Sequence, residues 1–223
     1  MGNFAEFLRT NFIHAAPLLV LGVLGAAIIL ERVQALMLRY PMNAGPFFDK
    51  LRDHVMADQI AEAIALCDKY RAKPVANVVR EGLLRAHQPE ALIEDGLELA
   101  VSEASQKVTK RTGFLATIAN VSTLMGLFGT ILGLIYSFGA VGNYTAQERS
   151  AQLGIGISTA MYATLMGLGV AIPCMIAFSY LMNRTNRLTV EVEQAAVRTM
   201  DLIRQRYYAA ENDPGRMPTQ RGA

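Results

Sequence analysis

Three long stretches of the chain contain no Asp, Glu, Lys or Arg, and they dominate its pattern of apolar and polar positions. They are residues 10–30, 112–147 and 150–183, with lengths of 21, 36 and 34 residues. A helix needs about 20 apolar residues to cross the hydrocarbon core of a bilayer. The pattern therefore predicts an all-α membrane protein with three transmembrane helices, near residues 12–32, 113–141 and 154–183.

The polar segment 33–112 has the pattern of a helical domain in solvent. Residues 58–70 place their apolar side chains on one face, and Asp58 is the expected N-cap of that helix. Pro74 and Pro89 are expected at helix starts, where a missing N–H group does no harm. Basic and acidic residues balance in this segment, which favours a solvated domain, although a cytoplasmic partner could also bind it.

The segment after residue 183 continues the helical pattern. Apolar positions repeat with a helical period from Leu188 to Ile203, so we expect the third span to extend into the cytoplasm as one long helix. Residues 211–223 are polar and rich in Pro and Gly, which predicts a disordered tail. The expected parts are an N-terminal segment with the first span (1–32), a cytoplasmic helical domain (33–112), the second and third spans with a short loop (113–183), and a C-terminal helix with its tail (184–223).

The basic residues predict how the chain is oriented in the membrane. Of the 21 Lys and Arg residues, 19 fall in segments 31–111 and 184–223, and the other two are Arg9 and Arg149. Cytoplasmic segments of membrane proteins carry the excess of Lys and Arg. We therefore expect the N-terminus on the outside and the C-terminus in the cytoplasm.

Composition narrows the class of function. The net charge of +2 gives no sign of nucleic-acid binding. Cys67 and Cys174 are expected in the cytoplasm and in lipid, respectively, which argues against a disulfide framework. The chain has no apparent nucleophile–base pair, metal-spaced cluster or phosphate loop. An enzyme is therefore the weakest option, and we expect no catalytic residue, metal or cofactor.

The second and third spans each carry a stripe of small and hydroxyl-bearing residues. At 100° per residue, each stripe covers an arc of about 120–140° on an ideal helix. In the second span it comprises Ala119, Ser122, Thr123, Gly126, Gly129, Thr130, Gly133, Ser137 and Ala140. In the third it comprises Gly156, Thr159, Ala160, Ala163, Thr164, Gly167 and Ala171. Such stripes let helices pack closely in lipid. They can equally line a path through the membrane, or face a partner helix that moves.

No span contains an Asp, Glu, Lys or Arg in its interior. A protein that moves protons through a membrane needs an intramembrane group that gains and loses charge. Tyrosine and cysteine, which do occur in the spans, have ordinary pKa values of about 10 and about 8.5. If this chain handles protons, a second polypeptide must therefore supply the carboxylate.

Two long motifs resemble the ExbB/TolQ/MotA family of proton-channel subunits. The sequence LATIANVSTLMGLFGTILGLIYSF (115–138) is similar to the signature of that family's second span, and GISTAMYATLMGLGVAIP (156–173) is similar to that of its third. The pair Glu31-Arg32 after the first span also matches. Three spans suit the ExbB and TolQ branches better than MotA, which has four.

The resemblance implies a homopentamer in the bacterial inner membrane, with the N-terminus periplasmic, around two copies of an ExbD/TolR-like single-span protein. Each partner helix would carry an aspartate, and proton flow would move the partner and deliver work to the envelope. TonB-dependent import, a Tol-Pal type task and gliding motility are the candidate uses, with a TonB/TolA-like or motility protein as a further partner. By motif, Thr130 and Thr164 match the family's functional threonines.

The expected proton path, facing the partner in the lumen, therefore comprises Thr130, Thr164, Thr159, Thr123, Ser122 and Ser137. Gly126, Gly129, Gly133, Gly156 and Gly167 are the expected close-packing residues.

The chain departs from the family pattern at two positions. Thr123 occupies a place where the second-span motif usually has proline, and Thr159 occupies a place where the ExbB and TolQ branches usually have glutamate. Pro173 is expected to bend the third span. The alternative function is a non-conducting membrane scaffold that holds a partner. For an ion path, the lack of any charged ligand favours H⁺ over Na⁺.

Overall fold

The structure is a computed structural model that describes residues 12–141 and 145–212. Within these residues the chain is helical and has no β-strand, which confirms the all-α prediction. Residues 213–223, the larger part of the expected disordered tail, lie outside the described residues, as does Arg9. The chain divides into two compact units, Met1–Val33 with Arg111–Met182 (unit 1) and Gln34–Lys110 with Asn183–Ala223 (unit 2).

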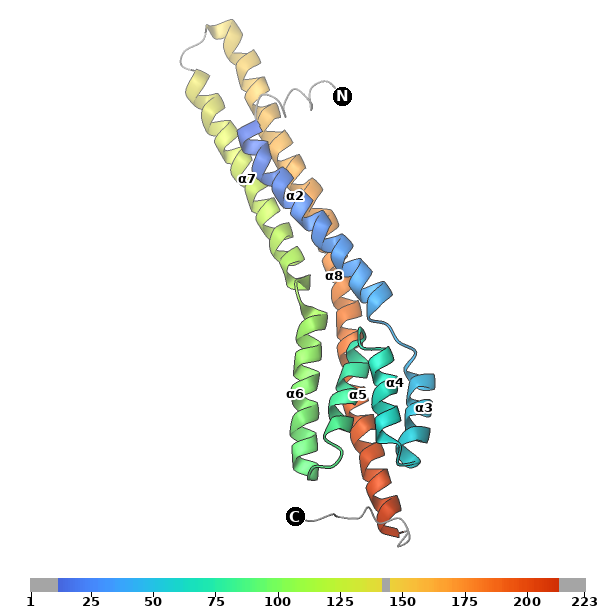
Figure 1. Ribbon diagram of the computed structural model, residues 1–223. Helices are drawn as coiled ribbons and strands as arrows, with labels where there is room; N and C mark the ends of the chain where they lie inside the picture. The colour runs from blue at the N-terminus through green and yellow to red at the C-terminus, as the bar shows by residue number, and fades with distance from the viewer. Residues whose placement is uncertain (1–11, 142–144, 213–223) are drawn as a thin grey trace. The chain divides into compact units, whose positions relative to one another are not determined.

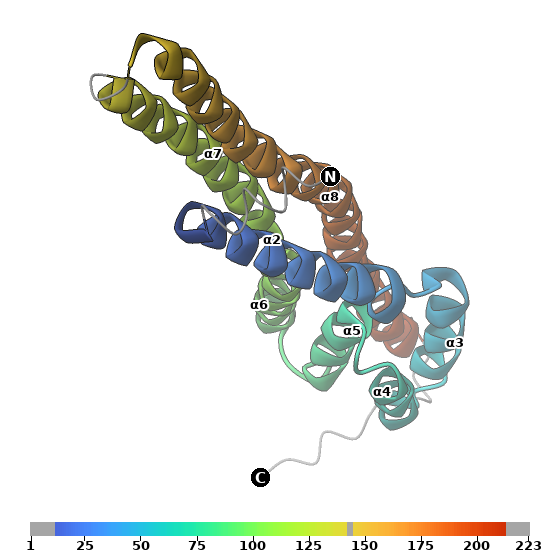
Figure 2. The ribbon, with the colours of Figure 1, turned by 90° about the horizontal axis from the view of Figure 1, so that it is seen from above.

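Unit 1 contains α2 (Phe12–Val33), α7 (Thr112–Val141) and the first part of the 67-residue α8 (Ala146–Asn212). In Figures 1 and 2, α7 and this part of α8 run side by side. Three helical stretches are long and apolar enough to cross a membrane: Ala15–Arg39, Glu90–Gly139 and Glu148–Ala209. The prediction of three such helices is confirmed, and so is the continuation of the third as one long helix.

The outer surface of unit 1 is strongly apolar. Large exposed side chains on its three helices include Val23, Leu30, Leu124, Phe128, Ile135, Met161, Leu165 and Ile176. Soluble monomers rarely expose apolar patches of this extent, whereas a bilayer solvates them. This surface, together with the helix lengths, identifies the chain as a membrane protein.

Helix α2 packs against α7 and α8 through its own glycines. A Cβ atom added to Gly25 would lie 2.6 Å from Sγ of Cys174, and one added to Gly22 would lie 3.3 Å from Cγ2 of Val170. Ile118 of α7 belongs to the same buried cluster as Cys174. Small residues let helix backbones approach in lipid, where dispersion contacts drive association.

The break between α6 and α7 lies at Arg111, which has φ 63°. This left-handed conformation costs a non-glycine residue about 1–2 kcal/mol. Its guanidinium donates to both carboxylate oxygens of Glu31, at 2.7 and 2.8 Å. The bidentate pair ties the start of α7 to the end of α2 and holds the strained residue in place.

Unit 2 is a bundle of shorter helices around the last part of α8 (Figure 1). Its elements are η1, a π-helical turn (Gln34–Arg39), α3 (Ala44–Met56), α4 (Ile60–Lys69), α5 (Pro74–Leu84) and α6 (Glu90–Thr109). Pro74 is the first residue of α5, and Pro89 is the N-cap of α6. Both helix starts expected from proline are confirmed.

The expected N-cap at Asp58 is wrong. Helix α4 begins at Ile60 with Gln59 as its N-cap, and no side chain caps it. Asp58 instead adopts φ 64°, and its carboxylate accepts a hydrogen bond of 2.8 Å from Nε of Arg206 in α8. An aspartate tolerates the left-handed region better than most residues, so the tertiary ion pair takes the side chain away from the helix end.

The core of unit 2 forms where α3, α4, α5 and α6 bury apolar faces against α8. Fully buried members include Leu51, Val55, Val79, Leu83 and Val192. The apolar positions that repeat along α8 between Leu188 and Ile203 are buried, so this stripe is a packing face. An ion pair between Arg204 and Glu90 joins α8 to the start of α6 at 2.6 Å.

Both cysteines are buried free thiols. Cys67 of α4 has 1% of its surface exposed. Burial, with a smaller contribution from the neighbouring Asp68, raises the pKa of its thiol to about 12. The thiol therefore stays protonated and unreactive in the folded protein at neutral pH.

The free energy of unfolding should fall at high pH because of Cys67. Between its ordinary pKa of 9.0 and about 12, the unfolded thiol loses its proton and the folded thiol keeps it. One proton corresponds to a slope of about 1.4 kcal/mol per pH unit. Denaturant midpoints of the wild type in detergent should fall more steeply with pH over this range than those of Cys67→Ala. Parallel curves for the two proteins would contradict the expectation, because all other titrating groups are shared.

Candidate functional site at the contact of α7 and α8

The backbones of α7 and α8 touch at Gly126 and Gly167. A Cβ atom added to Gly167 would lie 2.6 Å from the carbonyl oxygen of Ser122 and 2.9 Å from Cα of Gly126. A Cβ added to Gly126 would lie 3.2 Å from Cα of Gly167. These neighbours are backbone atoms that cannot rotate away, so only glycine fits at Gly167 without moving a helix.

The close contact continues along both helices toward the loop that joins them. A Cβ on Gly129 would lie 2.7 Å from Cβ of Ala163, and one on Gly133 would lie 2.9 Å from Cβ of Ala160. Gly156 of α8 lies against the side chain of Ser137 in the same way. The structure thus places all five expected close-packing glycines between α7 and α8 of one chain.

Two threonines face one another beside this contact. Oγ1 of Thr164 lies 3.4 Å from Oγ1 of Thr130 and 3.3 Å from the carbonyl oxygen of Gly126. Oγ1 of Thr130 lies 2.6 Å from the carbonyl oxygen of Leu127 in its own helix. Both threonines are half-buried, so the pair joins the two helices and still has exposed surface.

The threonine pair has an adjustable hydrogen-bonding capacity. Each hydroxyl has one proton and two lone pairs. Thr130 uses its proton on the carbonyl of Leu127, which leaves its lone pairs to accept from Thr164. The proton of Thr164 can point to Thr130 or to the carbonyl of Gly126. Rotation of either hydroxyl would redirect a donor toward a water molecule or a carboxylate outside the chain.

The structure does not bring the other expected lumen residues to this pair. Ser122 is fully buried, and its Oγ has no hydrogen-bond partner among the described residues. Ser137 is 7% exposed and donates to the carbonyl of Gly133 at 2.7 Å. In this conformation the chain itself covers all of Ser122 and nearly all of Ser137.

Thr123 is exposed on α7 and donates to the carbonyl of Ala119 at 3.0 Å. Thr159 is half-buried on α8. A role for either residue in a lumen stays a prediction. Pro173 lies inside α8, which continues through it, and the bend expected there also stays a prediction.

The site has no charged side chain. Residues 112–141 of α7 and 150–183 of α8 contain no Asp, Glu, Lys or Arg. No group of three or more His, Cys, Asp or Glu side chains in the described parts of the chain could hold a metal ion. The polar groups that the α7–α8 site offers are therefore hydroxyls and backbone carbonyls. They lie in an apolar surrounding, where each hydrogen bond is stronger than in water.

Sequence reasoning identified both threonines but not their contact with each other. A signal was present, because Thr130 and Thr164 lie at corresponding edges of the two small-residue stripes. Two antiparallel helices that pack through such stripes can bring these edges together. The ion pair of Glu31 and Arg111 had no comparable signal, since 80 residues separate its members.

Residues 70–194 match the model of the MotA/TolQ/ExbB proton channel family. Over 170 residues, the chain is 34% identical to a biopolymer transport protein ExbB-like 3 of Synechocystis sp., covering 74% of this chain and 78% of the relative. It is 25% identical over 193 residues to an ExbB homolog of Methanothermobacter thermautotrophicus, covering 86% of this chain and 67% of the relative.

The chain is also 36% identical over 104 residues to the Tol-Pal system protein TolQ of Haemophilus influenzae. That match covers 45% of this chain and 45% of TolQ, so it spans less than half of the relative's length. The family match covers α5, α6, α7 and residues 146–194 of α8, and so includes both threonines of the pair. Together with the three apolar helices, these matches confirm the resemblance seen in the two motifs: the chain belongs to the MotA/TolQ/ExbB proton channel family.

Proposed function

We propose that this chain is the channel subunit of an inner-membrane motor that is driven by the proton motive force. The observation that carries the proposal is the contact of Thr130 with Thr164 in a pair of apolar helices that belong to a proton channel family. A threonine hydroxyl that donates to a carbonyl of its own helix can rotate and donate instead to a carboxylate or a water molecule in the ion path. The chain thus supplies a polar but uncharged surface along an otherwise apolar path.

The ionisable group of the motor belongs to a second protein. An ionised carboxylate inside a bilayer is costly, and it is retained only where polar groups solvate it. We propose that Thr130 and Thr164 solvate an aspartate on the single span of an ExbD/TolR-like partner. Protonation removes the charge and weakens that contact, so the partner helix can leave the hydroxyls and move along the apolar wall.

The proposed assembly is a homopentamer around two partner helices. The exposed apolar side chains of α2, α7 and α8 support it, because neighbouring copies, partner helices and lipid can all cover such surfaces. The excess of Lys and Arg in residues 31–111 and 184–223 favours a cytoplasmic C-terminus and a periplasmic N-terminus. Residues 33–112 and 184–223 are then the cytoplasmic parts.

The driven process is proposed at the level of the cell envelope. Some relatives are named for the Tol-Pal system and others for biopolymer transport. We propose that this chain likewise transmits work through its partner to an envelope protein, of the TonB/TolA type or of a motility system.

A non-conducting scaffold is the second candidate. The observation in its favour is that the small-residue stripes are used for packing within one chain, where Ser122 and Ser137 are already covered. A scaffold would bind the same single-span partner but would need no hydroxyl exchange. Assembly without ion flow separates the two functions.

The test is proton flow in liposomes that contain this chain with an aspartate-bearing single-span partner, taken from a neighbouring reading frame. An imposed pH gradient should drive proton uptake only when both proteins are present. Replacing the partner's aspartate with asparagine should abolish uptake and leave the complex intact. A complex that forms without proton flow would establish the scaffold function. A ring of this chain that conducts protons without the partner would overturn the proposal that the partner supplies the ionisable group.

A further inference from the structure

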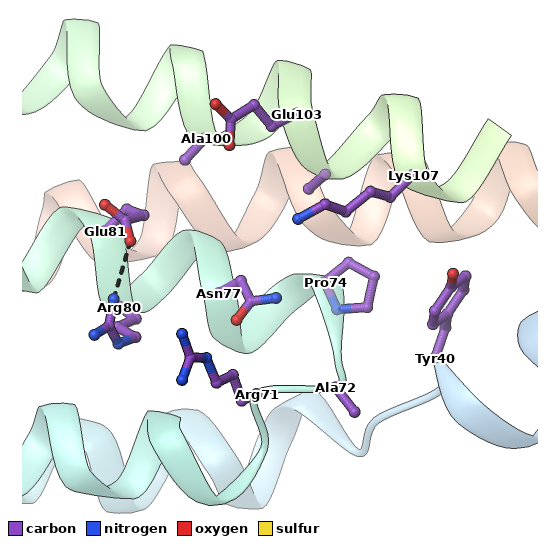
Figure 3. Close-up of a pocket in the computed structure, with 11 residues that line it drawn as sticks. Tyr40, Arg71, Ala72, Pro74, Asn77, Arg80, Glu81, Ala100, Glu103 and Lys107 are labelled. Carbon is purple, nitrogen blue, oxygen red and sulfur yellow. Dashed lines mark hydrogen bonds and ion pairs between the residues drawn. The ribbon is translucent and has the colours of Figure 1, made fainter. Parts of the chain in front are cut away.

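Ser122 of α7 carries a buried hydroxyl that has no hydrogen-bond partner among the described residues. Partly covered polar side chains elsewhere do meet partners: at the cavity of unit 2, Arg80 donates to Glu81 at 3.1 Å (Figure 3). Three other buried hydroxyl oxygens in the described part of the chain also lack a partner, those of Ser105, Thr112 and Thr185. Two of these lie in unit 2 and one belongs to the first residue of α7. Ser122 is therefore the member of this group that lies well inside an apolar helix of unit 1.

The contact of α7 with α8 covers the hydroxyl of Ser122. This residue lies one helical turn before Gly126 in the small-residue stripe, and its carbonyl oxygen would lie 2.6 Å from a Cβ atom added to Gly167. The stretch of α8 around Gly167, residues 165–173, has no polar side chain. The hydroxyl thus points into an apolar contact that offers it no side-chain partner.

The missing hydrogen bond makes the present conformation less stable than it would be with alanine at this position. A hydroxyl that loses water on burial and gains no partner bears the full cost of its desolvation. Ser137, on the same helix, avoids this cost because it donates to the carbonyl of Gly133 at 2.7 Å. Folded proteins contain few such unmet groups, and a second conformation in which Ser122 has a partner would account for this one.

We propose that Ser122 binds water in a second conformation, in which α7 and α8 have moved apart where Ser122 and Gly126 meet Gly167. We call this contact the glycine gate; it is closed in the present conformation. The inference rests on the proposed motor function, because the gate adjoins the ion path: Oγ1 of Thr164 lies 3.3 Å from the carbonyl oxygen of Gly126.

The open gate would extend the hydrogen-bonded path from the threonine pair toward the start of α7. Eight residues separate Ser122 from Thr130, which is about 12 Å along a helix. Apolar and backbone groups fill that interval in the closed gate, so water has to enter before a proton can pass. The start of α7 is the cytoplasmic end in the proposed orientation, so the gate lies on the cytoplasmic side of the threonine pair.

The hydroxyl of Ser122 then sets the balance between the two conformations. It is unmet in the closed gate and bonded to water in the open one, so it favours opening. Ser122→Ala removes the desolvation cost from the closed gate and the hydrogen bond from the open gate. Both effects shift the population toward the closed conformation, so the variant should be more stable and conduct less.

Stability is measured first, on the full chain in detergent. Ser122→Ala should raise the temperature of thermal unfolding by about 2–4 °C. The matched control is Ser137→Ala, which removes a covered hydroxyl of the same helix that does have a partner. This control should leave the unfolding temperature unchanged or lower it. An unfolding temperature of Ser122→Ala at or below that of the wild type would overturn the proposal, because the hydroxyl would then have a partner in the closed gate.

Proton flow is measured next, in liposomes that also contain the aspartate-bearing partner. Ser122→Ala should reduce flow about fivefold or more, while recovery of the partner stays at the wild-type level. Unchanged flow in this variant would overturn the gate. If Thr164→Val still reduced flow in the same experiment, the proposed motor function would stand without the gate.

Opening is measured separately from flow, by reaction of Ser122→Cys with a water-soluble methanethiosulfonate. The wild type is the blank, because Cys67 and Cys174 are both buried. Modification of Ser122→Cys should be faster in the complex under a pH gradient than in this chain alone. An equally slow reaction in both samples would show that water does not reach this position, and would overturn the proposal even if protons flow. Reaction without any proton flow would support an opening contact and count against the motor.

Discussion

Gly167→Ala is expected to force α7 and α8 apart and to lower the free energy of unfolding by about 1–3 kcal/mol or more. The added methyl group would lie 2.6 Å from the carbonyl oxygen of Ser122 and 2.9 Å from Cα of Gly126. Both are backbone atoms, so a side-chain rotation cannot relieve the overlap. Contacts along the rest of the stripe, such as that of Gly129 with Ala163, would be lost as the helices separate.

Gly169→Ala is the matched control for that substitution. Gly169 lies two residues further along α8, and a Cβ atom there has no neighbour within 4 Å. Alanine favours a helix over glycine by about 1 kcal/mol, so this variant should be as stable as the wild type or slightly more so. Thermal unfolding in detergent measures both proteins. Equal unfolding temperatures for Gly167→Ala and Gly169→Ala would show that α7 and α8 do not make this contact.

Thr164→Val is expected to reduce proton flow by about 10- to 100-fold while the complex with the partner still assembles. Valine has nearly the shape of threonine but cannot donate to Thr130, to the carbonyl of Gly126 or to an incoming carboxylate. Loss of a hydrogen bond to a charged group corresponds to a rate change of this size. Thr130→Val should act in the same direction, and Thr164→Ser should recover much of the flow.

Thr117→Val is the control for the hydroxyl substitutions. Thr117 is an exposed threonine of the same apolar helix, α7, and lies outside the small-residue stripe. Its replacement should leave proton flow within about twofold of the wild type. Proton uptake into liposomes and recovery of the partner should be measured on the same preparations. Full proton flow in the Thr130→Val, Thr164→Val double variant would exclude conduction through this pair.

The two sets of variants separate packing from conduction. Gly167→Ala should lower stability, assembly and proton flow together, because it moves the helices that carry the threonines. Thr164→Val should lower proton flow alone. A loss of assembly in Thr164→Val would mean that the hydroxyl acts as a bond between α7 and α8 rather than as part of an ion path.

The local pattern of residues was enough to predict the helices. Charge-free stretches predict the three apolar helices, because hydrophobic length is a property of consecutive residues. Proline favours the first position of a helix because it has no N–H group, and this preference depends only on the residue itself. It correctly placed Pro74 at the first residue of α5. Asp58 shows where this reasoning fails, since its side chain bonds to Arg206, 148 residues away, instead of capping the next helix.

The sequence by itself therefore determined that this protein is helical, that it has three helices suited to a membrane, and that two of them carry small hydroxyl-bearing stripes. Only the tertiary structure decided which hydroxyls are covered and which of them pair. The reason is that Thr130 and Thr164 lie 34 residues apart in sequence. Helical period sets the direction of each side chain, whereas helix packing sets its neighbours.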